Sequence, residues 1–243
     1  MKVFRTLIQL IFVLSISLVI INPAAARDLK ATLGLIPPYA FSSDKGMLVD
    51  LVKAMDEIYT DGKITIDAFP TARAIDNLLK GTHDFFMPML KSDTMDFEAL
   101  PFRFSETLWS SIFVLYTNKN NKEINLSNLA NYKIETLSNI ISYFDIPMLP
   151  SAGLESSLKK VDMGRIDGYI FSMGPVDATL KKLGLKNIKR TNFKTFEGPI
   201  VVKKGSNGDE VEAILLPLLK QLRENGTFDK IMAPVLNQEF KEW

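Results

Sequence analysis

The sequence predicts an α/β protein built from two lobes of similar construction, and three observations support this. Strand and helix patterns alternate along the chain from Lys30 onward. The third strand pattern, residues 85–89, is wholly apolar, as expected of a parallel strand covered on both faces. A Gly-x-x-Asp motif also occurs twice, each time between a helix pattern and an apolar strand pattern. Such alternation is typical of βαβ units in a mainly parallel sheet.

The first series of elements is strand, helix, strand, helix and strand, predicted over residues 30–35, 48–55, 64–68, 71–80 and 85–89. Pro37-Pro38 ends the first strand. The first helix has apolar residues at i, i+3, i+4 and i+7, which is the stripe of a half-buried helix. Residues 64–68 alternate between apolar and polar as a strand does. Gly81 suits the C-terminal end of the second helix.

A second series follows a strand at 112–116 and a polar segment. It is predicted as a strand at 132–136, a helix start at Ser138-Asn139, strands at 169–171 and 200–202, and a long helix over 211–222. Gly226 suits the end of that helix. Pro217 lies inside its apolar pattern, so we expect a kink there or a later start.

The two Gly-x-x-Asp motifs are Gly81 to Asp84 and Gly164 to Asp167. Glycine takes the left-handed conformation that often ends a helix, so each copy alone is weak. Their matching contexts indicate two equivalent lobes. Asp84 and Asp167 are therefore expected to cap turns away from the functional cleft rather than to form an acid/base pair.

The composition excludes several function classes. Lys and Arg number 29 against 28 Asp and Glu, so a basic surface for nucleic acid is unsupported. The chain has no cysteine, which excludes disulfides, thiolate metal sites and cysteine nucleophiles. His83 is the one histidine, so we expect no metal site and no catalytic triad, and we predict a structural role for His83.

Residues 1–26 have the three parts of a secretory signal peptide. Lys2 and Arg5 give a positive start, residues 7–21 are apolar, and Ala24-Ala25-Ala26 supplies the small residues that a signal peptidase requires. An N-terminal membrane anchor is the alternative, but the apolar run is short for a span of about 20 residues. We expect cleavage after Ala26 and a free periplasmic product, since no cysteine follows that could carry a lipid.

Several short motifs follow one another along the rest of the chain. They are residues 37–41 (PPYAF), Gly46 with 49–51 (VDL), 78–84 (LLKGTHD), 104–109 (FSETLW), 164–167 (GRID), 201–206 (VVKKGS) and 222–231 (LRENGTFDKI). In this order and spacing they resemble the extracellular solute-binding proteins of family 3, the periplasmic receptors that serve ABC transporters. The resemblance covers essentially the whole chain after residue 26.

The resemblance implies a two-lobed type II periplasmic-binding-protein-like fold: two mainly parallel sheets flanked by helices and joined by two crossing strands. Lobe 1 would comprise residues 27–113 and 199–243, and lobe 2 residues 119–194, with hinge strands at about 112–118 and 195–202. A small-molecule solute would lie between the lobes. The implied partner is an inner-membrane ABC permease. The implied protein is a monomer without cofactor, catalytic residues or nucleic-acid partner.

Departures from the family pattern bear on the solute. Members that take amino acids hold the α-carboxylate with an arginine in the loop after the Gly-x-x-Asp aspartate, because a guanidinium matches a carboxylate in bidentate fashion. Here that position is Asp96, in a loop that also carries Asp93 and Glu98. The lobe-2 aspartate that binds the α-amino group would fall near Ser172 or Met173 and is missing too. We therefore expect a small anionic or zwitterionic solute that is not a standard α-amino acid.

Five candidate ligand-binding residues line the implied cleft by their positions in the family pattern. Tyr39 and Phe41, after the first strand, correspond to aromatic residues that flank the ligand, and Phe69 matches another such position. Phe171 and Ser172 end a strand that would face the cleft from lobe 2. Aromatic walls exclude water and stack on flat groups. Any one of the aromatic residues could instead belong to the core.

The remaining candidates are polar. Arg73 lies in the first turn of a predicted helix, where free N–H groups and a cation could hold an anion. Its alternative is a surface arginine that pairs with a nearby aspartate. Lys91 occupies roughly the place of a ligand-bonding threonine, and its alternative is a solvated loop lysine. Ser138 and Asn139 begin the first helix of lobe 2, where they could hold an acceptor or simply cap the helix.

Two other functions stay open. The first is a sensory or accessory binding subunit, which no residue distinguishes from a transport receptor. The second is an enzyme on the same fold that dehydrates cyclic acids. It would need a carboxylic acid of raised pKa in the cleft, for which Glu155 and Glu197 are the candidates.

Overall fold

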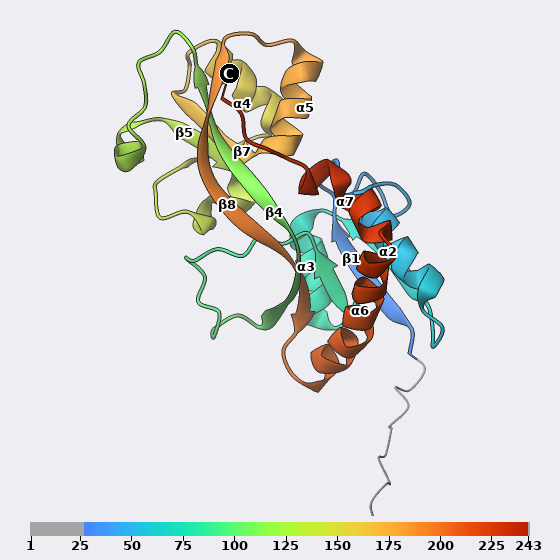
Figure 1. Ribbon diagram of the computed structural model, residues 1–243. Helices are drawn as coiled ribbons and strands as arrows, with labels where there is room; N and C mark the ends of the chain where they lie inside the picture. The colour runs from blue at the N-terminus through green and yellow to red at the C-terminus, as the bar shows by residue number, and fades with distance from the viewer. Residues whose placement is uncertain (1–26, 243) are drawn as a thin grey trace, which may run out of the picture.

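The computed structural model describes residues 27–242, which fold into two lobes joined by two long strands (Figure 1). The predicted signal peptide, residues 1–26, lies outside the described residues. The elements of the first half are β1 (Leu29–Gly34), α2 (Met47–Ile58), β2 (Ile64–Phe69), α3 (Thr71–Lys80), β3 (Phe85–Met87) and β4 (Phe102–Asn118). The elements of the second half are η1 (Leu126–Asn131), β5 (Ile134–Leu137), η2 (Ser138–Tyr143), β6 (Leu149–Ser151), α4 (Leu154–Asp162), β7 (Gly168–Ser172), α5 (Met173–Leu183), β8 (Ile188–Lys203), α6 (Ser206–Glu224) and α7 (Thr227–Leu236).

The strands form one sheet in the order β2-β1-β3-β8-β4-β7-β5-β6. The order is symmetric about the central pair β8-β4. On one side β1 pairs in parallel with β2 and β3, and on the other β5 pairs in parallel with β6 and β7. Each set of three parallel strands meets the central pair through an antiparallel contact. The two lobes therefore have the same construction, as the repeated motif predicted.

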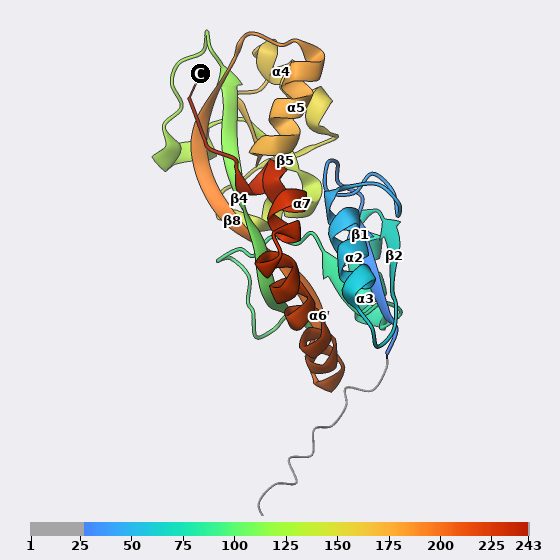
Figure 2. The same ribbon diagram turned by 45° about the vertical axis from the view of Figure 1, so that its right-hand side comes forward.

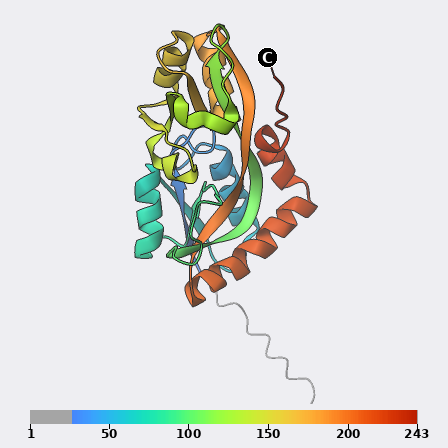
Figure 3. The same ribbon diagram turned by 90° about the vertical axis from the view of Figure 1, so that its left-hand side faces the viewer.

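The structure has one continuous sheet, whereas two separate sheets were expected, and the central pair of strands explains the difference. β4 and β8 are hydrogen-bonded in antiparallel register from Phe102 and Lys203 to Asn118 and Ile188, with irregularities near Thr107 and between Phe113 and Val114. Figure 3 shows both strands passing from one lobe to the other. Because each strand serves both lobes, the sheet is continuous, and the predicted hinge segments are the C-terminal parts of these longer strands.

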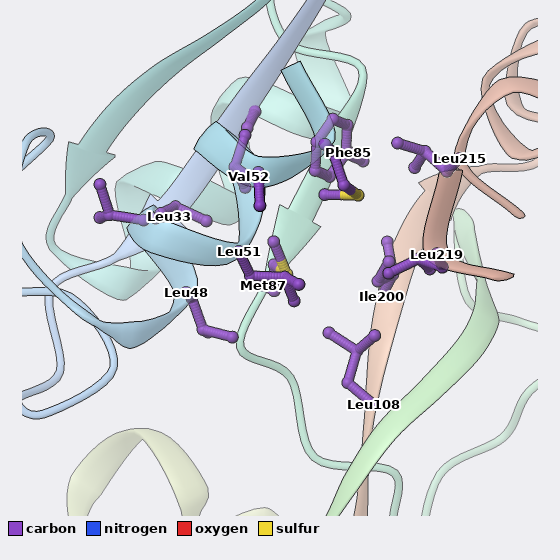
Figure 4. Packing of buried hydrophobic residues seen from close by; sticks show 14 of the residues in the cluster. Leu33, Leu48, Leu51, Val52, Phe85, Met87, Leu108, Ile200, Leu215 and Leu219 are labelled. Atoms are coloured by element: carbon purple, nitrogen blue, oxygen red, sulfur yellow. The ribbon is translucent and has the colours of Figure 1, made fainter. Parts of the chain in front are cut away.

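Lobe 1 buries its sheet between two layers of helices. Apolar residues of α2, α6 and α7 pack on one face of β1, β3 and β8, as Figure 4 shows for Leu48, Phe85 and Leu219. On the other face Leu78 of α3 packs with Phe86 and Val201. A strand covered on both faces must be wholly apolar, which accounts for the Phe-Phe-Met sequence of β3.

Lobe 2 has a separate core with a large aromatic share. Phe113 of β4 contacts Phe171 of β7 and Phe196 of β8, with ring centroids 5.6 and 4.8 Å apart. Helices α4 and α5 pack beside each other against this part of the sheet (Figure 2). Such aromatic contacts add roughly 0.5–1.5 kcal/mol each beyond the burial of area.

The aspartates of the two Gly-x-x-Asp motifs have the same structural role in the two lobes. Asp84 accepts a hydrogen bond from the backbone N–H of Lys30 at 2.8 Å, at the start of β1. Asp167 accepts one from the backbone N–H of Lys133 at 2.7 Å, just before β5. Both carboxylates thus fasten the amino-terminal ends of neighbouring parallel strands. Neither is among the residues that line the cavities between the lobes.

The chain returns to lobe 2 after its last helix. α6 and α7 belong to the core of lobe 1, but the segment after α7 runs back along the molecule (Figures 1 and 2). Phe240 packs against the core of lobe 2, and the Arg190 guanidinium lies 5.5 Å from its ring centroid. Arg190 Nε donates to the Lys241 carbonyl at 2.7 Å. These C-terminal residues therefore differ from the expected division, which assigns 199–243 to lobe 1.

Most predicted elements agree with the structure. α3 spans Thr71–Lys80 as predicted, and Gly81 takes the left-handed conformation at its end. α6 continues through Pro217 and begins before it, at Ser206, so the proline does not move the start of the helix. Gly226 separates α6 from α7. Between residues 27 and 242, none of the helices combines the length and the hydrophobicity needed to cross a lipid bilayer.

We expect Asp84→Ala to lower the free energy of unfolding by about 2 kcal/mol, because a charged acceptor of one backbone and one guanidinium hydrogen bond is lost. Asp84 also pairs with Arg27 at 2.6 Å, and its side chain is 17% exposed. The matched control is Asp76→Ala, since Asp76 is half exposed and pairs with Lys80 along one helix. It should change stability by about 0.5 kcal/mol or less. Equal losses in urea unfolding would contradict the role given to Asp84.

Candidate functional site

A cavity lies where the carboxyl ends of the parallel strands of both lobes face each other. Such ends are the usual ligand site of open α/β sheets. Lobe 1 contributes residues after β1, β2 and β3 and one residue of β4: Ile36, Tyr39, Thr71, Pro88, Met89, Leu90 and Trp109. Lobe 2 contributes residues after or at the ends of β5 and β7: Leu137, Asn139, Ile140, Tyr143, Phe171 and Ser172. Ser111 and Phe113 of β4 complete the lining.

The free space in this cavity is small, about 60 Å³ as the volume open to the centre of a water-sized sphere. A wider crevice of about 520 Å³ by the same measure lies beside it. Ile36, Leu137 and Phe171 line both, so the two spaces adjoin. The crevice also has one ion pair on its wall, between Glu155 and Lys182 at 2.7 Å. Together they form a gap between the lobes that is mostly apolar.

Hydroxyl and aromatic groups from both lobes gather around Tyr39 in the cavity. The rings of Tyr39 and Trp109 stack with centroids 5.3 Å apart. Ser111 and Ser172 hydrogen-bond to each other through their Oγ atoms at 3.0 Å, which joins β4 to the end of β7. Burial raises the pKa of Tyr39, and the nearby Ser172, Ser111 and Trp109 side chains oppose the rise. The phenol is therefore neutral at physiological pH.

The Trp109 indole is held in place from both sides. Tyr39 covers one side, and on the other the Gly198 backbone comes so close that an added Cβ would lie 2.6 Å from Cε2 of the indole. The side chain is 3% exposed. Its N–H is near enough to affect the pKa of Tyr39 but makes no hydrogen bond of good geometry, and it is left without an acceptor.

Direct bonds between the lobes close one side of the gap. The loop after β3 carries Ser92, whose Oγ donates to the Tyr143 carbonyl at 2.8 Å, and Thr94, whose Oγ1 donates to the Ser142 carbonyl at 2.9 Å. Tyr143 in turn directs its hydroxyl to the Met89 sulfur at 3.6 Å. Lobe 1 and lobe 2 are therefore in contact through side chains as well as through the crossing strands.

Four of the predicted site residues line the central cavity: Tyr39, Asn139, Phe171 and Ser172. Phe41 lines the adjoining crevice with its ring half exposed. The structure brings these five residues together from three separate segments. This arrangement is consistent with the sequence-based hypothesis that these positions contact a ligand.

The other four predicted site residues line neither space. Arg73 lies 4.7 Å above the Phe69 ring at the surface of lobe 1. Lys91 pairs with Glu197 at 3.1 Å, and Ser138 is exposed. These side chains stay candidates for contact with a solute in a more open arrangement of the lobes.

Several cavity residues were not predicted, among them Trp109, Ser111, Phe113, Met89 and Tyr143. Trp109 belongs to the FSETLW motif, and nothing in the local sequence pattern indicates that the strand on which it lies passes the cavity. His83 is buried, and its Nε2 lies 3.1 Å from an Asp67 carboxylate oxygen, away from the cavity lining. Residues 27–242 contain no group of three or more side chains that could hold a metal ion.

Comparison with known proteins gives the fold. No family model and no curated protein matches the sequence. Solved structures do match, and they show that the chain has the two-lobed fold of type II periplasmic binding proteins. A structure from a study of glutathione import via GshT and the cystine ABC importer TcyBC of Streptococcus mutans has a TM-score of 0.70 and 14% identity. It covers 88% of this chain and 96% of its own.

Two further structures have the same fold. A histidine kinase sensor domain with similarity to periplasmic binding proteins has a TM-score of 0.69 at 17% identity, over 86% of this chain and 96% of its own. The ancestral amino acid-binding protein AncCDT-1, a precursor of cyclohexadienyl dehydratase, has a TM-score of 0.64 at 17% identity, over 86% and 95%. The predicted resemblance to periplasmic binding proteins is thus confirmed for the fold.

We expect Gly198→Ala to displace the Trp109 indole and to lower the free energy of unfolding by about 1–3 kcal/mol through overpacking. The matched control is Gly174→Ala, where the close atoms belong to the flexible end of Gln238. Gly174 lies in α5, so alanine there should be neutral or stabilising by up to about 1 kcal/mol. Near-ultraviolet circular dichroism should change for Gly198→Ala and not for Gly174→Ala. The reverse pattern would contradict the packing described.

Stability should fall at alkaline pH. Burial raises the pKa of Tyr143 to about 12, whereas an unfolded tyrosine has a pKa of about 10. Between these values the unfolded chain binds fewer protons, so the contribution of Tyr143 is complete below pH 10 and is lost as the pH rises towards 12. The difference in unfolding free energy between wild type and Tyr143→Phe should shrink by up to about 1.4 kcal/mol per pH unit in that range. A difference independent of pH would count against a buried phenol.

Proposed function

We propose that this protein is a periplasmic solute-binding protein that captures a small organic solute between its lobes for an ABC-type transporter. The observation that carries the proposal is the cavity formed by carboxyl strand ends of both lobes. A solute there would touch both lobes at once, and burial from two sides strengthens each polar contact. The structure of the ABC importer study shares this fold and so agrees with the proposal.

The proposed solute is not a standard α-amino acid. The loop after β3 has Asp93, Asp96 and Glu98 where an arginine would be needed. Its Ser92 and Thr94 are hydrogen-bonded to lobe 2 instead of facing free space. On the other side Ser172 is hydrogen-bonded to Ser111, and the cavity lining formed by the described residues includes no Asp or Glu for an α-amino group. These contacts favour a solute that uses other groups of the cavity.

The sequence predicts an anionic or zwitterionic solute from Arg73 and Lys91. In this structure Arg73 covers Phe69 and Lys91 is paired with Glu197. Both cations are accessible to solvent, but neither lines the central cavity or the adjoining crevice, so a solute bound there would not contact them. The proposal of a small organic solute other than an amino acid therefore rests on the size of the gap and on the missing amino-acid anchors. The charges of Arg73 and Lys91 support it less.

A sensory or accessory binding subunit is the second candidate, favoured by the sensor domain of the same fold. We propose no catalytic role. A dehydratase would need a cleft carboxylic acid of raised pKa. The Lys182 ammonium instead lowers the pKa of Glu155. Glu197 accepts a hydrogen bond from Lys91 at 3.1 Å.

Binding should be tested by thermal unfolding against a library of organic acids, peptides, amino acids and uncharged metabolites. A solute at a hundredfold excess over its Kd should stabilise the protein by about 2.7 kcal/mol. Asn139→Trp should abolish this stabilisation, because the exposed Asn139 lines the cavity and the larger ring would fill it. Asp145→Trp is the control, since Asp145 is exposed and lines neither space.

Silence of the wild-type protein across the whole library would contradict the proposal. So would equal stabilisation of wild type and Asn139→Trp, because the solute would then bind elsewhere. Turnover of a cyclic acid such as prephenate would show that the protein is an enzyme and would overturn the receptor hypothesis.

A further inference from the structure

We infer that the solute of the central cavity is a compact uncharged molecule that carries a hydrogen-bond acceptor, a carbonyl or hydroxyl oxygen, for the indole N–H of Trp109. The inference rests on the proposed function and names its substrate class. It differs from the anionic or zwitterionic solute that the sequence predicts.

The lining of the central cavity carries no charge. Its residues from 27–242 include no Asp, Glu, Lys, Arg or His, and Tyr39 and Tyr143 are kept neutral by raised pKa values. The two charged residues on the wall of the adjoining crevice, Glu155 and Lys182, pair with each other. An ion moved from water into such a site loses its hydration and gains no partner of opposite charge. The lining therefore selects against charged solutes.

Trp109 offers the unused donor. Five buried polar side-chain atoms in the described part of the chain have no hydrogen-bond partner, and Trp109, which carries one of them at Nε1, is the one of these five residues that lines the cavity. Buried donors are nearly always paired, so an orphan donor at a cavity calls for an explanation. An acceptor oxygen of the solute would supply the missing partner and restore the bond that the indole loses on burial.

The rest of the lining fits an apolar body attached to that oxygen. Phe113 and Phe171 present aromatic surface 5.6 Å apart between centroids, and Ile140 and Leu137 face the space from lobe 2. Ser111 and Ser172 share one hydrogen bond, so one of the two hydroxyl protons stays free for a second oxygen of the solute. A flat or cyclic molecule with one polar end would match both the walls and the donor.

The experiment compares three probes of nearly one shape: benzamide, which is neutral, benzoate, which is an anion, and benzamidine, which is a cation. Trp243→Phe removes the second of the two tryptophans and leaves Trp109 as the reporter of binding. We expect benzamide to shift the Trp109 fluorescence and to bind at least about tenfold more tightly than either charged probe, because charge burial is unfavourable.

The hydrogen bond is tested separately with toluene, which lacks the acceptor. In the ¹⁵N-labelled protein the Trp109 indole N–H resonance should move downfield with benzamide and not with toluene. Trp109→Phe should weaken benzamide binding about tenfold more than toluene binding, the factor expected for one net hydrogen bond. The resonance shift is read on the unaltered cavity, so the test stands even if the variant does not fold.

The outcomes separate the inference from the proposed function. If benzoate, benzamidine or a zwitterion such as glutamate binds as tightly as benzamide or more so, the solute class is overturned and the receptor function stands. An indole resonance that benzamide leaves unmoved, although it binds, overturns the role of Trp109 and means that a water satisfies the N–H. If neither these probes nor any library compound binds, both the inference and the proposed function fail.

Discussion

The antiparallel pairing of β4 with β8 is the interaction on which the rest of the structure depends. These strands of 17 and 16 residues hydrogen-bond along nearly their whole length and carry part of each lobe core. Their pairing sets where the parallel strands of each lobe attach, β3 on one side and β7 on the other. Because both attachments are antiparallel, the carboxyl ends of the two parallel sets come to face a common gap.

Because of this strand polarity, the residues that stabilise the sheet and the residues that line the cavity lie at opposite ends of the parallel strands. At the amino-terminal ends of the parallel strands, Asp84 and Asp167 bond to backbone N–H groups and fasten neighbouring strands. At the carboxyl ends the chain turns into loops and helix starts, and these line the cavity. A carboxylate at the first edge can therefore be vital to folding and irrelevant to a ligand. The same division explains why the two repeated motifs resemble each other while the cavity residues of the two lobes do not.

The sequence predicted elements whose signal is local and missed features that arise from distant contacts. α3 was predicted with its bounds, because its apolar spacing and Gly81 are both local. β4 was predicted as 112–116 although it starts at Phe102, because residues 102–111 mix polar and apolar side chains on a strand that leaves one lobe for another. Tyr39 and Phe171 were found through a family resemblance. Trp109 became a cavity residue only through tertiary packing, and no period in the sequence marks it.

The hydrogen bonds of Ser92 and Thr94 to lobe 2 have a kinetic consequence. They hold the lobes together through protein groups alone, so the closed conformation forms without a bound ligand. The proposed solute would then bind only the fraction of molecules in which these bonds are broken, and its apparent affinity would be reduced by that fraction. Release of the proposed solute would require the same bonds to break again, so these contacts would slow both its entry and its exit.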